Sequence, residues 1–286
     1  MLGVKEILER ARDEKWAVPH FNISNFEMLK ALVEAALDLR SPLLIGTSEG
    51  ERDFIGLKSA VSLVLSLREE YDFPIYLNAD HSYSVEKAKA AIDAGYDSVH
   101  IDLSKKSFEE NVAGTREVVE YAKAKNPAIS IEGEIGYFVT DSSKIYKETI
   151  DVPIESLARP IEATDFFKQT GVHRLAPVVG GIHGVAKNEG HLDIERIGHI
   201  HKAIPDAVLV LHGGSGDPPE ELKAAIKAGI ANIHISTDLR VAYVDALRRE
   251  IAKDEVAPYK IMGPVIDAVK KIAIRNIRLF ESDGKV

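Results

Sequence analysis

The stretch PIYLNADHSYSVEKAKAAIDAGYDSVHIDL, residues 74–103, contains one complete strand–helix–strand unit. Apolar strand-like runs cover 74–79 and 97–103, and residues 85–94 between them repeat apolar side chains at the three- and four-residue spacing of a helix with one buried face. Ser84 stands where a helix N-cap is expected, and Gly95 supplies the left-handed residue with which many helices end. Such a unit is the repeating element of α/β folds.

The same alternation continues along the whole chain. Further strand-like segments cover 17–23, 42–47, 129–135, 174–182, 207–212 and 231–236, and further helix-like segments cover 26–39, 108–124, 193–203 and 219–228. Ser24 and Ser107 stand at expected helix starts, and Gly229 at an expected helix end. Eight such units predict one (β/α)8 TIM barrel domain over residues 1–286. The alternative is an open doubly wound sheet, which predicts one dominant crevice, whereas functional-looking residues here follow many strands.

Two segments depart from the repeat. Residues 137–163, after the fifth strand, are longer and less regular than an ordinary strand-to-helix loop, and long loops at the catalytic face of a barrel are often lids. Residues 262–280 have a helical pattern after the eighth unit. We expect this additional C-terminal helix to pack outside the barrel or against a second subunit.

The composition excludes several classes of protein. A hydrophobic content of 45% allows a large core, while a net charge of −9 and a pI near 5.6 argue against a nucleic-acid-binding face. No apolar run approaches the roughly 18 to 20 residues that span a membrane, and no secretory signal is visible at the N-terminus. We therefore expect a cytoplasmic protein without nucleic-acid or membrane partners. Because the chain has no cysteine, a metal site must use nitrogen and oxygen ligands.

Three histidines, His81, His183 and His212, lie at or just past the ends of strand-like runs. A closed barrel brings these ends onto one face, where three imidazoles leave a Zn²⁺ ion one open position, as in catalytic zinc sites. Asp80 would place a carboxylate beside the metal. A single histidine of this kind is more often a structural hydrogen-bonding residue, but three at three strand ends favour a metal site.

The remaining histidines fall into two groups. His20, His100 and His234 lie within strands, where a functional role is harder to dismiss. The other four fall on helix or loop positions and are expected to be ordinary surface residues: His173, His191, His199 and His201.

Two acidic residues, Asp102 and Glu134, also end strands on the expected catalytic face. We expect them either to make structural ion pairs with lysine or arginine, or to bind a second cation, or to act as an alternate zinc ligand. Glu132 shares the side of Glu134 by the two-residue alternation of a strand.

A glycine-rich turn, Gly213-Gly-Ser-Gly216, follows the seventh strand, and Ser236-Thr237 follows the eighth. Barrels commonly bind phosphate at these two loops, because exposed backbone N–H groups and hydroxyls donate hydrogen bonds to an anion. Such a turn alone is usually only a turn, but its position directly after His212 favours a phosphate site.

Together, these residues resemble a known family, the class II zinc-dependent fructose- and tagatose-bisphosphate aldolases. The resemblance is collinear over nearly the whole chain. It is carried by Val18-Pro-His-Phe-Asn22, Asn78-Ala-Asp-His81, Ser98-Val-His-Ile-Asp102, Glu132-Gly-Glu-Ile-Gly136, His183-Gly184, Leu211-His-Gly-Gly-Ser-Gly216 and Ile235-Ser-Thr-Asp238.

The resemblance implies a role for each matching residue. His81, His183 and His212 match the catalytic zinc ligands, and Asp80 matches the acid/base that handles the proton on the C4 hydroxyl. Asp102 and Glu134 match the ligands of a second cation, divalent or monovalent. The matches to the substrate site are Asn22, Gly184, Gly213, Gly214, Ser215, His234, Ser236 and Thr237, with Ser48 matching a residue that contacts the aldehyde half.

The chain also departs from the family pattern around the substrate. His234-Ile-Ser-Thr237 stands where the family usually has Asn-x-Asp-Thr, and His20 replaces a usual small residue. Residues 137–146 lack the family's Gly-Gly-x-Glu-Asp motif, whose glutamate moves the proton at C3. Asp141, Glu148 and Asp151 are the candidates to replace that glutamate.

The resemblance implies reversible aldol cleavage of a phosphorylated ketose, with fructose 1,6-bisphosphate as the leading substrate and dihydroxyacetone phosphate and an aldehyde as products. The alternatives are an aldolase or epimerase acting on another sugar, such as tagatose bisphosphate, and a non-catalytic aldolase-like subunit. A serine hydrolase is disfavoured because the turn around Ser215 lacks the nucleophile-elbow spacing. Family members are usually dimers or tetramers, and Arg275 and Arg278 are candidates to reach a distal phosphate.

Overall fold

Eight parallel strands close into a barrel in which each strand pairs with the next along the chain and β8 pairs with β1. The computed structural model describes residues 2–140, 144–182, 184 and 191–286. The strands are β1 (Val18–Asn22), β2 (Leu43–Thr47), β3 (Ile75–Ser82), β4 (Ser98–Ile101), β5 (Ser130–Ile135), β6 (Arg174–Pro177), β7 (Val208–Leu211) and β8 (Ile230–Ile235). The closed barrel confirms the predicted TIM fold and excludes the open sheet.

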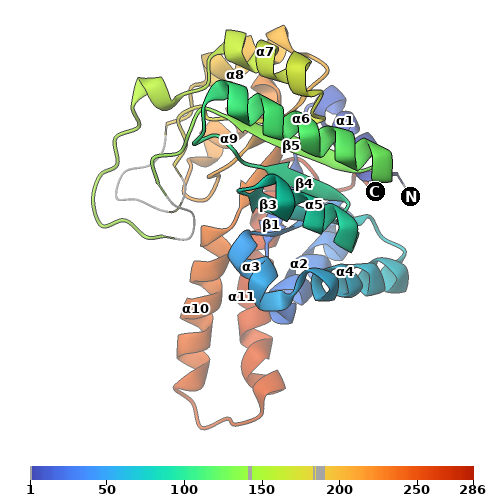
Figure 1. Cartoon of the computed structure of the whole chain (residues 1–286). Coiled ribbons are helices and arrows are strands. Elements are labelled where there is room, and N and C mark those ends of the chain that lie inside the picture. The colour runs from blue at the N-terminus through green and yellow to red at the C-terminus, as the bar shows by residue number, and fades with distance from the viewer. Residues whose placement is uncertain (1, 141–143, 183, 185–190) are drawn as a thin grey trace.

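The helices surround these strands, and α10 and α11 form a hairpin that projects from the barrel (Figure 1). Their bounds are α1 (Val4–Glu14), α2 (Phe26–Leu39), α3 (Glu49–Ile55), α4 (Leu57–Tyr71), α5 (Val85–Ala94), α6 (Phe108–Lys125), α7 (Pro160–Thr170), α8 (Ile194–Ala203), α9 (Pro219–Ala228), α10 (Thr237–Ile251) and α11 (Pro258–Leu279), with a short 3-10 turn at Ile154–Ser156. Among the helices of the described residues, none combines the length and apolar character required to cross a lipid bilayer.

The helix ends follow local capping chemistry, with one correction. Ser84 and Ser107 cap α5 and α6 as predicted, because their hydroxyls accept hydrogen bonds from backbone N–H groups of the first turn. The cap of α2, however, is Asn25, whose side chain accepts from Met28 N at 3.0 Å. Ser24, the predicted cap, instead donates to Glu51.

Two predicted strand boundaries are wrong for reasons of backbone conformation. The sixth strand ends at Pro177 rather than 182, because Gly180 turns the chain with φ +111 and a Cβ at that position would overlap the carbonyl of His191. The third strand runs on to Ser82, so His81 lies within it rather than past its end. There the register with β4 shifts between Ala79 and Ser82, and His81 adopts φ +45.

The predicted lid segment is shorter than expected. Its described residues 144–153 are irregular, but α7 begins at Pro160 rather than after residue 163. Proline is favoured at the first position of a helix because its missing N–H is unpaired there in any case.

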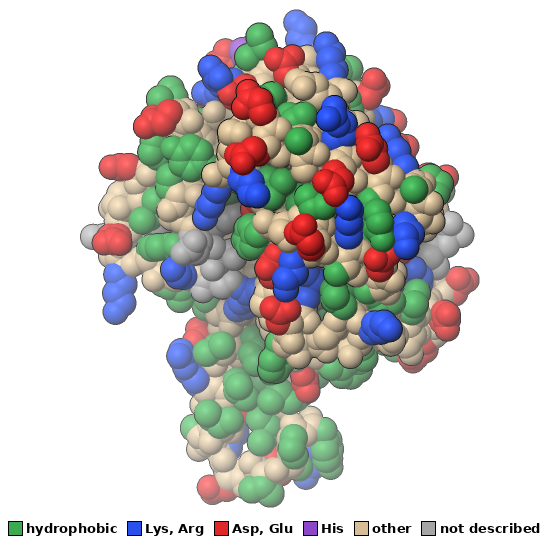
Figure 2. Space-filling view, viewed as in Figure 1, with side chains coloured by type: hydrophobic (Ala, Val, Ile, Leu, Met, Phe, Trp, Pro, Cys, Tyr) green, Lys and Arg blue, Asp and Glu red, His purple; other side chains and the backbone are tan. Residues whose placement is uncertain are grey.

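The C-terminal helix packs on the outside of the barrel, which is one of the two arrangements predicted for it. It begins at Pro258 instead of 262, and its inner part contacts α2 and β1 through Val269, Ala273 and Ile277. Its outer part belongs to the hairpin, where hydrophobic side chains are visible on the surface (Figure 2).

The two ends of the barrel differ. At the N-terminal end, α1 and Trp16 form a hydrophobic cluster with Val18, Leu44 and Val208 and close the barrel. Above it, the barrel interior is polar: the guanidinium of Arg174 is fully buried and donates to Asn78, Ser98, Ser130 and Asn232. The functional site therefore lies at the C-terminal end, as is usual for this fold.

Candidate functional site

A small cavity of about 30 Å³ lies at the C-terminal end of the barrel. It is lined by Asn22, Asp80, His81, Gly184, His212, Gly213, Ser215, His234, Ser236 and Thr237, which come from β1, β3, β8, the loops after β6 and β7, and the start of α10. All ten are among the residues predicted from the sequence. His183 lies outside the described residues, so the structure says nothing of its placement.

The irregularity in β3 explains how two consecutive residues reach one cavity. In a regular strand Asp80 and His81 would point to opposite faces, because side chains alternate. The left-handed conformation of His81 breaks that alternation, and both side chains line the cavity. The guanidinium of Arg52 stabilises the distortion by donating to the carbonyl of Asp80 at 2.9 Å and to Ser82 Oγ at 3.2 Å.

Four buried residues could together bind a metal ion. One ligand atom from each of Asp80, His81, His100 and His212 lies within 4.8 Å of the others. Asp80 Oδ1 and His100 Nε2 are buried without a hydrogen-bond partner in the described part of the chain, although such atoms normally have one. A nitrogen and oxygen set with unsatisfied atoms fits a borderline divalent cation.

A second overlapping group contains His81, His100, Asp102 and Glu134. Asp102 Oδ2 lies 2.8 Å from His81 Nδ1, and Glu134 Oε2 lies 3.5 Å from His100 Nε2. Asp102 and Glu134 were expected either to pair with lysine or arginine or to hold a cation. In the described structure they face histidines rather than lysine or arginine, and the four residues form a group that could hold a metal ion.

The acidic groups strongly perturb one another. Burial opposes protonation of His81, but the charges of Asp80 and Asp102 outweigh it and raise the pKa of His81 to about 10. Burial, followed by the charge of Asp102, raises the pKa of Glu134 well above its ordinary value. Three carboxylates crowded in a desolvated space are stabilised by positive charge, whether from a proton or from a metal ion.

Two residues beneath the cavity orient His212. Glu132 Oε1 lies 2.6 Å from His212 Nε2, and Glu132 Oε2 lies 2.8 Å from a guanidinium nitrogen of Arg174. Burial opposes ionisation of Glu132, but Arg174 and His100 hold its pKa well below the usual range. Glu132 would thus fix the tautomer and the ring orientation of His212 as a metal ligand.

Asp80 is held between side chains from two strands. Its Oδ2 accepts a hydrogen bond from Asn22 Nδ2 at 3.0 Å, and its Oδ1 lies 3.3 Å from His234 Nδ1. Asn22 Nδ2 also donates to Glu51. The same carboxylate accepts hydrogen bonds from the backbone N–H and the hydroxyl of Ser48. Ser48 caps α3 and does not line the cavity.

The glycine-rich turn closes another side of the cavity. Gly213 has φ +75, and a Cβ there would lie 2.5 Å from the carbonyl oxygen of Ile182. Ser215 Oγ accepts hydrogen bonds from the N–H groups of Ser236 and Asp238 and so joins the turn to the start of α10. Gly214 does not line the cavity, because it lies on the outer side of the turn against Ile233.

Several residues lie differently from their predicted places. His173 is not an ordinary surface histidine, since its side chain is only 12% exposed and lies 2.8 Å from Ser130 Oγ and 3.2 Å from Glu9. Glu148 and Asp151 are exposed and do not line the cavity, and Asp141 lies outside the described residues. Arg275 pairs with Asp238 at 2.7 Å on the outer surface.

Sequence reasoning missed Arg52 and Arg174, and it singled out His100 without assigning it to the site. Only His100 had a usable signal, because two-residue alternation places it on the inner side of β4 with Ser98. Arginine is almost never fully buried, so nothing in the sequence distinguished Arg52 and Arg174 from surface arginines.

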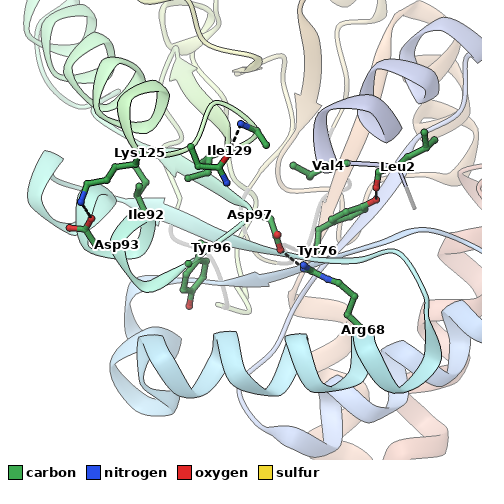
Figure 3. A pocket seen from close by; sticks show the side chains of 14 residues that line it. Leu2, Val4, Arg68, Tyr76, Ile92, Asp93, Tyr96, Asp97, Lys125 and Ile129 are labelled. Carbon is green, nitrogen blue, oxygen red and sulfur yellow. Dashed lines mark hydrogen bonds and ion pairs between the residues drawn. The ribbon is translucent and has the colours of Figure 1, made fainter.

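A larger hollow of about 530 Å³ lies at the opposite end of the barrel. Figure 3 shows its charged side chains pointing toward one another, with Arg68 paired to Asp97 and Lys125 to Asp93. Tyr76 donates to the carbonyl of Leu2 and closes one side. Because its charges are neutralised internally, this hollow lacks the reactive groups of the smaller cavity.

Comparison with known proteins agrees with this geometry. The family model described as "Fructose-bisphosphate aldolase class-II" matches residues 3–285. The chain is 39% identical over 293 residues to a fructose-bisphosphate aldolase of Geobacillus stearothermophilus, covering 100% of this chain and 98% of that protein. It is 35% identical to a probable fructose-bisphosphate aldolase of Bacillus subtilis, covering 100% and 99%.

Solved structures show the same relationship. The YdjI aldolase from Escherichia coli K12 superposes with a TM-score of 0.84 at 29% identity, covering 99% of this chain and 98% of that one. A putative fructose-1,6-bisphosphate aldolase from Coccidioides immitis gives 0.85 at 27% identity, covering 99% and 97%. The chain is therefore an aldehyde-lyase and belongs to the class-II fructose-bisphosphate aldolase family, whose members depend on a metal ion.

Proposed function

We propose that this protein catalyses the zinc-dependent, reversible cleavage of a phosphorylated ketose into dihydroxyacetone phosphate and an aldehyde, with fructose 1,6-bisphosphate as the leading substrate. The observation that carries the proposal is the meeting of Asp80, the histidine cluster and the glycine-rich turn in one cavity. A carboxylate, a metal site and an anion site are the three parts that such a cleavage requires.

His81, His183 and His212 are the proposed zinc ligands. His100 lies in the same group and is a further candidate, while Asp102 and Glu134 are proposed for a second cation. Imidazole and carboxylate ligands suit zinc among the available divalent ions. When bound, the zinc ion would supply a Lewis acid for the negative charge that cleavage leaves on the ketone fragment.

Asp80 is the proposed acid/base of the reaction. Cleavage of the C3–C4 bond requires removal of the C4 hydroxyl proton, and the reverse reaction returns it. The carboxylate is buried at the cavity wall, and burial is outweighed by the neighbouring His81, which with His100 and His234 holds the pKa of Asp80 well below its ordinary value. It is therefore ionised and able to accept a proton at neutral pH.

The phosphate of the ketone fragment is proposed to bind at the turn after β7. Gly213 and Ser215 of this turn and Gly184 of the loop after β6 would present backbone N–H groups there, together with Ser236 and Thr237 at the start of α10, whereas the predicted Gly214 lies on the outer side of the turn. The N-terminus of a helix favours an anion, because its N–H groups have no partner within the helix. Ser48 and Asn22 are proposed on the side of the aldehyde half.

A different ketose phosphate is the second candidate substrate, including tagatose bisphosphate. The supporting observation is that His234 lines the cavity beside Asp80, with the buried ring of His20 stacked against it. The ring of His234 restricts the space available to the sugar carbons, so the C4 configuration or chain length accepted here can differ from that of relatives.

Assembly into a homodimer or homotetramer is proposed through the α10–α11 hairpin. Val256 and Tyr259 at its tip are 88% and 77% exposed, and Ile251 is 62% exposed. Exposed apolar residues on one projecting element are typical of a surface that another subunit covers.

The test is metal analysis of the purified protein combined with cleavage assays on a panel of ketose mono- and bisphosphates. We expect about one zinc ion per chain and cleavage of fructose 1,6-bisphosphate that a chelator abolishes and zinc restores. Preferred cleavage of tagatose bisphosphate would establish the second candidate. Inactivity of the zinc-loaded protein on every member of the panel would contradict both.

A further inference from the structure

Two histidine rings stack inside the barrel mouth. The centroids of His20 on β1 and His234 on β8 lie 3.5 Å apart with an interplanar angle of 10°. These residues are direct neighbours in the ladder between β1 and β8, and both side chains are buried. The rings therefore touch over their full faces, on the inner side of the barrel.

His20 has little freedom to move. Its Nε2 lies 3.0 Å from Asn78 Nδ2, a residue that also receives a hydrogen bond from Arg174. Its ring covers Gly46 on the neighbouring strand so closely that a Cβ at residue 46 would overlap His20 Cε1. Glycine at this position thus makes room for the imidazole, and the imidazole fills it.

His234 is in contact with two neighbouring rings. His20 covers one face, and the ring of His212 lies 4.0 Å away, centroid to centroid, at an angle of 46°. Its Nε2 lies 3.3 Å from Asn232 Oδ1, an atom that already accepts a hydrogen bond from Arg174 at 3.0 Å. This leaves Nδ1 directed at Asp80.

Two buried atoms without partners face each other at that point. Asp80 Oδ1 and His234 Nδ1 lie 3.3 Å apart, and neither has a hydrogen-bond partner in the described part of the chain. The other carboxylate oxygen of Asp80 is bound by Asn22 Nδ2 at 3.0 Å. Buried polar atoms cost free energy unless they are paired, and because the ionised carboxylate can only accept, a proton on His234 Nδ1 would pair both atoms at this distance.

We propose that His234 is a positioning residue that fixes the orientation of the Asp80 carboxylate, and that His20 acts on Asp80 indirectly by holding the ring of His234. The inference rests on the proposed role of Asp80 as acid/base. A carboxylate held by Asn22 alone can rotate about its Cβ–Cγ bond, whereas contacts to both oxygens fix the direction of its lone pairs. Misorientation of a proton-transferring group lowers the rate of the chemical step far more than it weakens substrate binding.

The first test separates the ring nitrogen from the ring itself. His234→Phe keeps an aromatic ring for stacking but removes Nδ1, and His234→Asn removes the stack but returns an amide nitrogen near the position of Nδ1. We expect His234→Phe to lower kcat about 10- to 100-fold with KM changed less than about threefold, and His234→Asn to retain more of kcat than His234→Phe. Full activity of His234→Phe would overturn the proposal.

The second test asks whether His234 works through Asp80. In the Asp80→Asn background, measured by single turnover, adding His234→Phe should lower the residual rate less than about threefold, because the group that it positions is already gone. An equal fold-loss in both backgrounds would show that the two residues act independently, and would overturn the proposal.

The role of His20 is tested in the same way. We expect His20→Ala to lower kcat about 3- to 10-fold in the wild-type background and to have no further effect in the His234→Phe background. Bound zinc and the melting temperature of each variant check that the fold persists. His201→Phe, on α8 and remote from the cavity, is the matched control and should keep full activity.

A structural measurement tests the role of His234 without knowledge of the substrate. Crystal structures of the wild-type and His234→Phe proteins at equal zinc content should show Asp80 in one orientation in the former, and rotated or in several conformers in the latter. An unchanged Asp80 in the variant would overturn the inference even if the enzyme acts on another sugar. Inactivity of the wild-type protein on all ketose phosphates, with Asp80 reoriented in the variant, would instead reject only the proposed function.

Discussion

Glu132 lies 2.6 Å from His212 and 2.8 Å from Arg174, so a buried ion pair inside the barrel orients a candidate metal ligand at its mouth. Carboxylates that contact the second nitrogen of a metal-binding histidine fix its tautomer and raise its basicity. The polar interior of this barrel therefore contributes to the site, although none of its deeper residues reaches the cavity.

The first prediction concerns that carboxylate. Glu132→Gln should weaken zinc binding about 10- to 100-fold, because the amide removes the negative charge beside His212 while keeping the shape of the side chain. Competition with a chromophoric zinc chelator measures this affinity. Glu117→Gln, on the exposed side of α6, is the control. Unchanged zinc affinity in Glu132→Gln would mean that His212 does not need this contact.

A second prediction concerns the partner of Glu132. Arg174→Met should lower the free energy of unfolding by about 3–5 kcal/mol, because it leaves a buried carboxylate without a counter-charge. Urea unfolding of the zinc-free protein measures the change. The double variant Arg174→Met/Glu132→Gln should recover part of the loss, since its interior charge is removed. A double variant that is less stable than the single one would contradict this explanation.

Gly46 provides a third prediction, on packing. Gly46→Ala should lower the free energy of unfolding by about 1–3 kcal/mol, because the added methyl group would overlap the ring of His20. Combining it with His20→Ala should remove most of this cost by vacating the space. Gly50→Ala, whose added methyl group meets nothing within 4 Å, is the control and should be neutral or slightly stabilising. Thermal or urea unfolding of the wild type, Gly46→Ala, Gly46→Ala/His20→Ala and Gly50→Ala measures these differences in stability.

The fourth prediction is a pH dependence that arises at Asp217. Burial, with smaller contributions from Glu221 and Asp238, raises the pKa of Asp217 to about 8, and neither carboxylate oxygen has a hydrogen-bond partner in the described structure. Between about pH 4 and 8 the unfolded chain releases this proton while the folded chain keeps it, so stability falls as the pH rises, by up to about 1.4 kcal/mol per pH unit.

Asp217→Asn should therefore stabilise the protein more at pH 8 than at pH 5. Urea unfolding at both pH values measures the difference, with Asp254→Asn as an exposed control that should show none. An equal stabilisation at both pH values would mean that Asp217 is already ionised in the folded state.

Much of this architecture could be predicted from local sequence patterns. The strand–helix alternation and the capping serines placed eight strands and most helices, because these signals depend on neighbours within a few residues. Asp80, His81 and His212, all expected near strand ends, line one cavity, since barrel closure forces the carboxyl ends of parallel strands together.

What could not be predicted depends on contacts between distant segments. The bulge that turns both Asp80 and His81 into the cavity is stabilised by Arg52, some 28 residues away along the chain. The burial of Arg174 is possible only because four strands, β3, β4, β5 and β8, supply acceptors around it. Neither arrangement leaves a pattern in its own stretch of sequence.

The most direct test of the proposed mechanism is the Asp80→Asn variant, assayed for both bound zinc and cleavage of fructose 1,6-bisphosphate. Because the proposed zinc ligands are untouched, we expect wild-type zinc content and a loss of kcat of at least about 100-fold. Replacing His212 with alanine should, by contrast, remove both zinc and activity. Normal turnover by zinc-loaded Asp80→Asn would contradict the assignment of Asp80 as the acid/base.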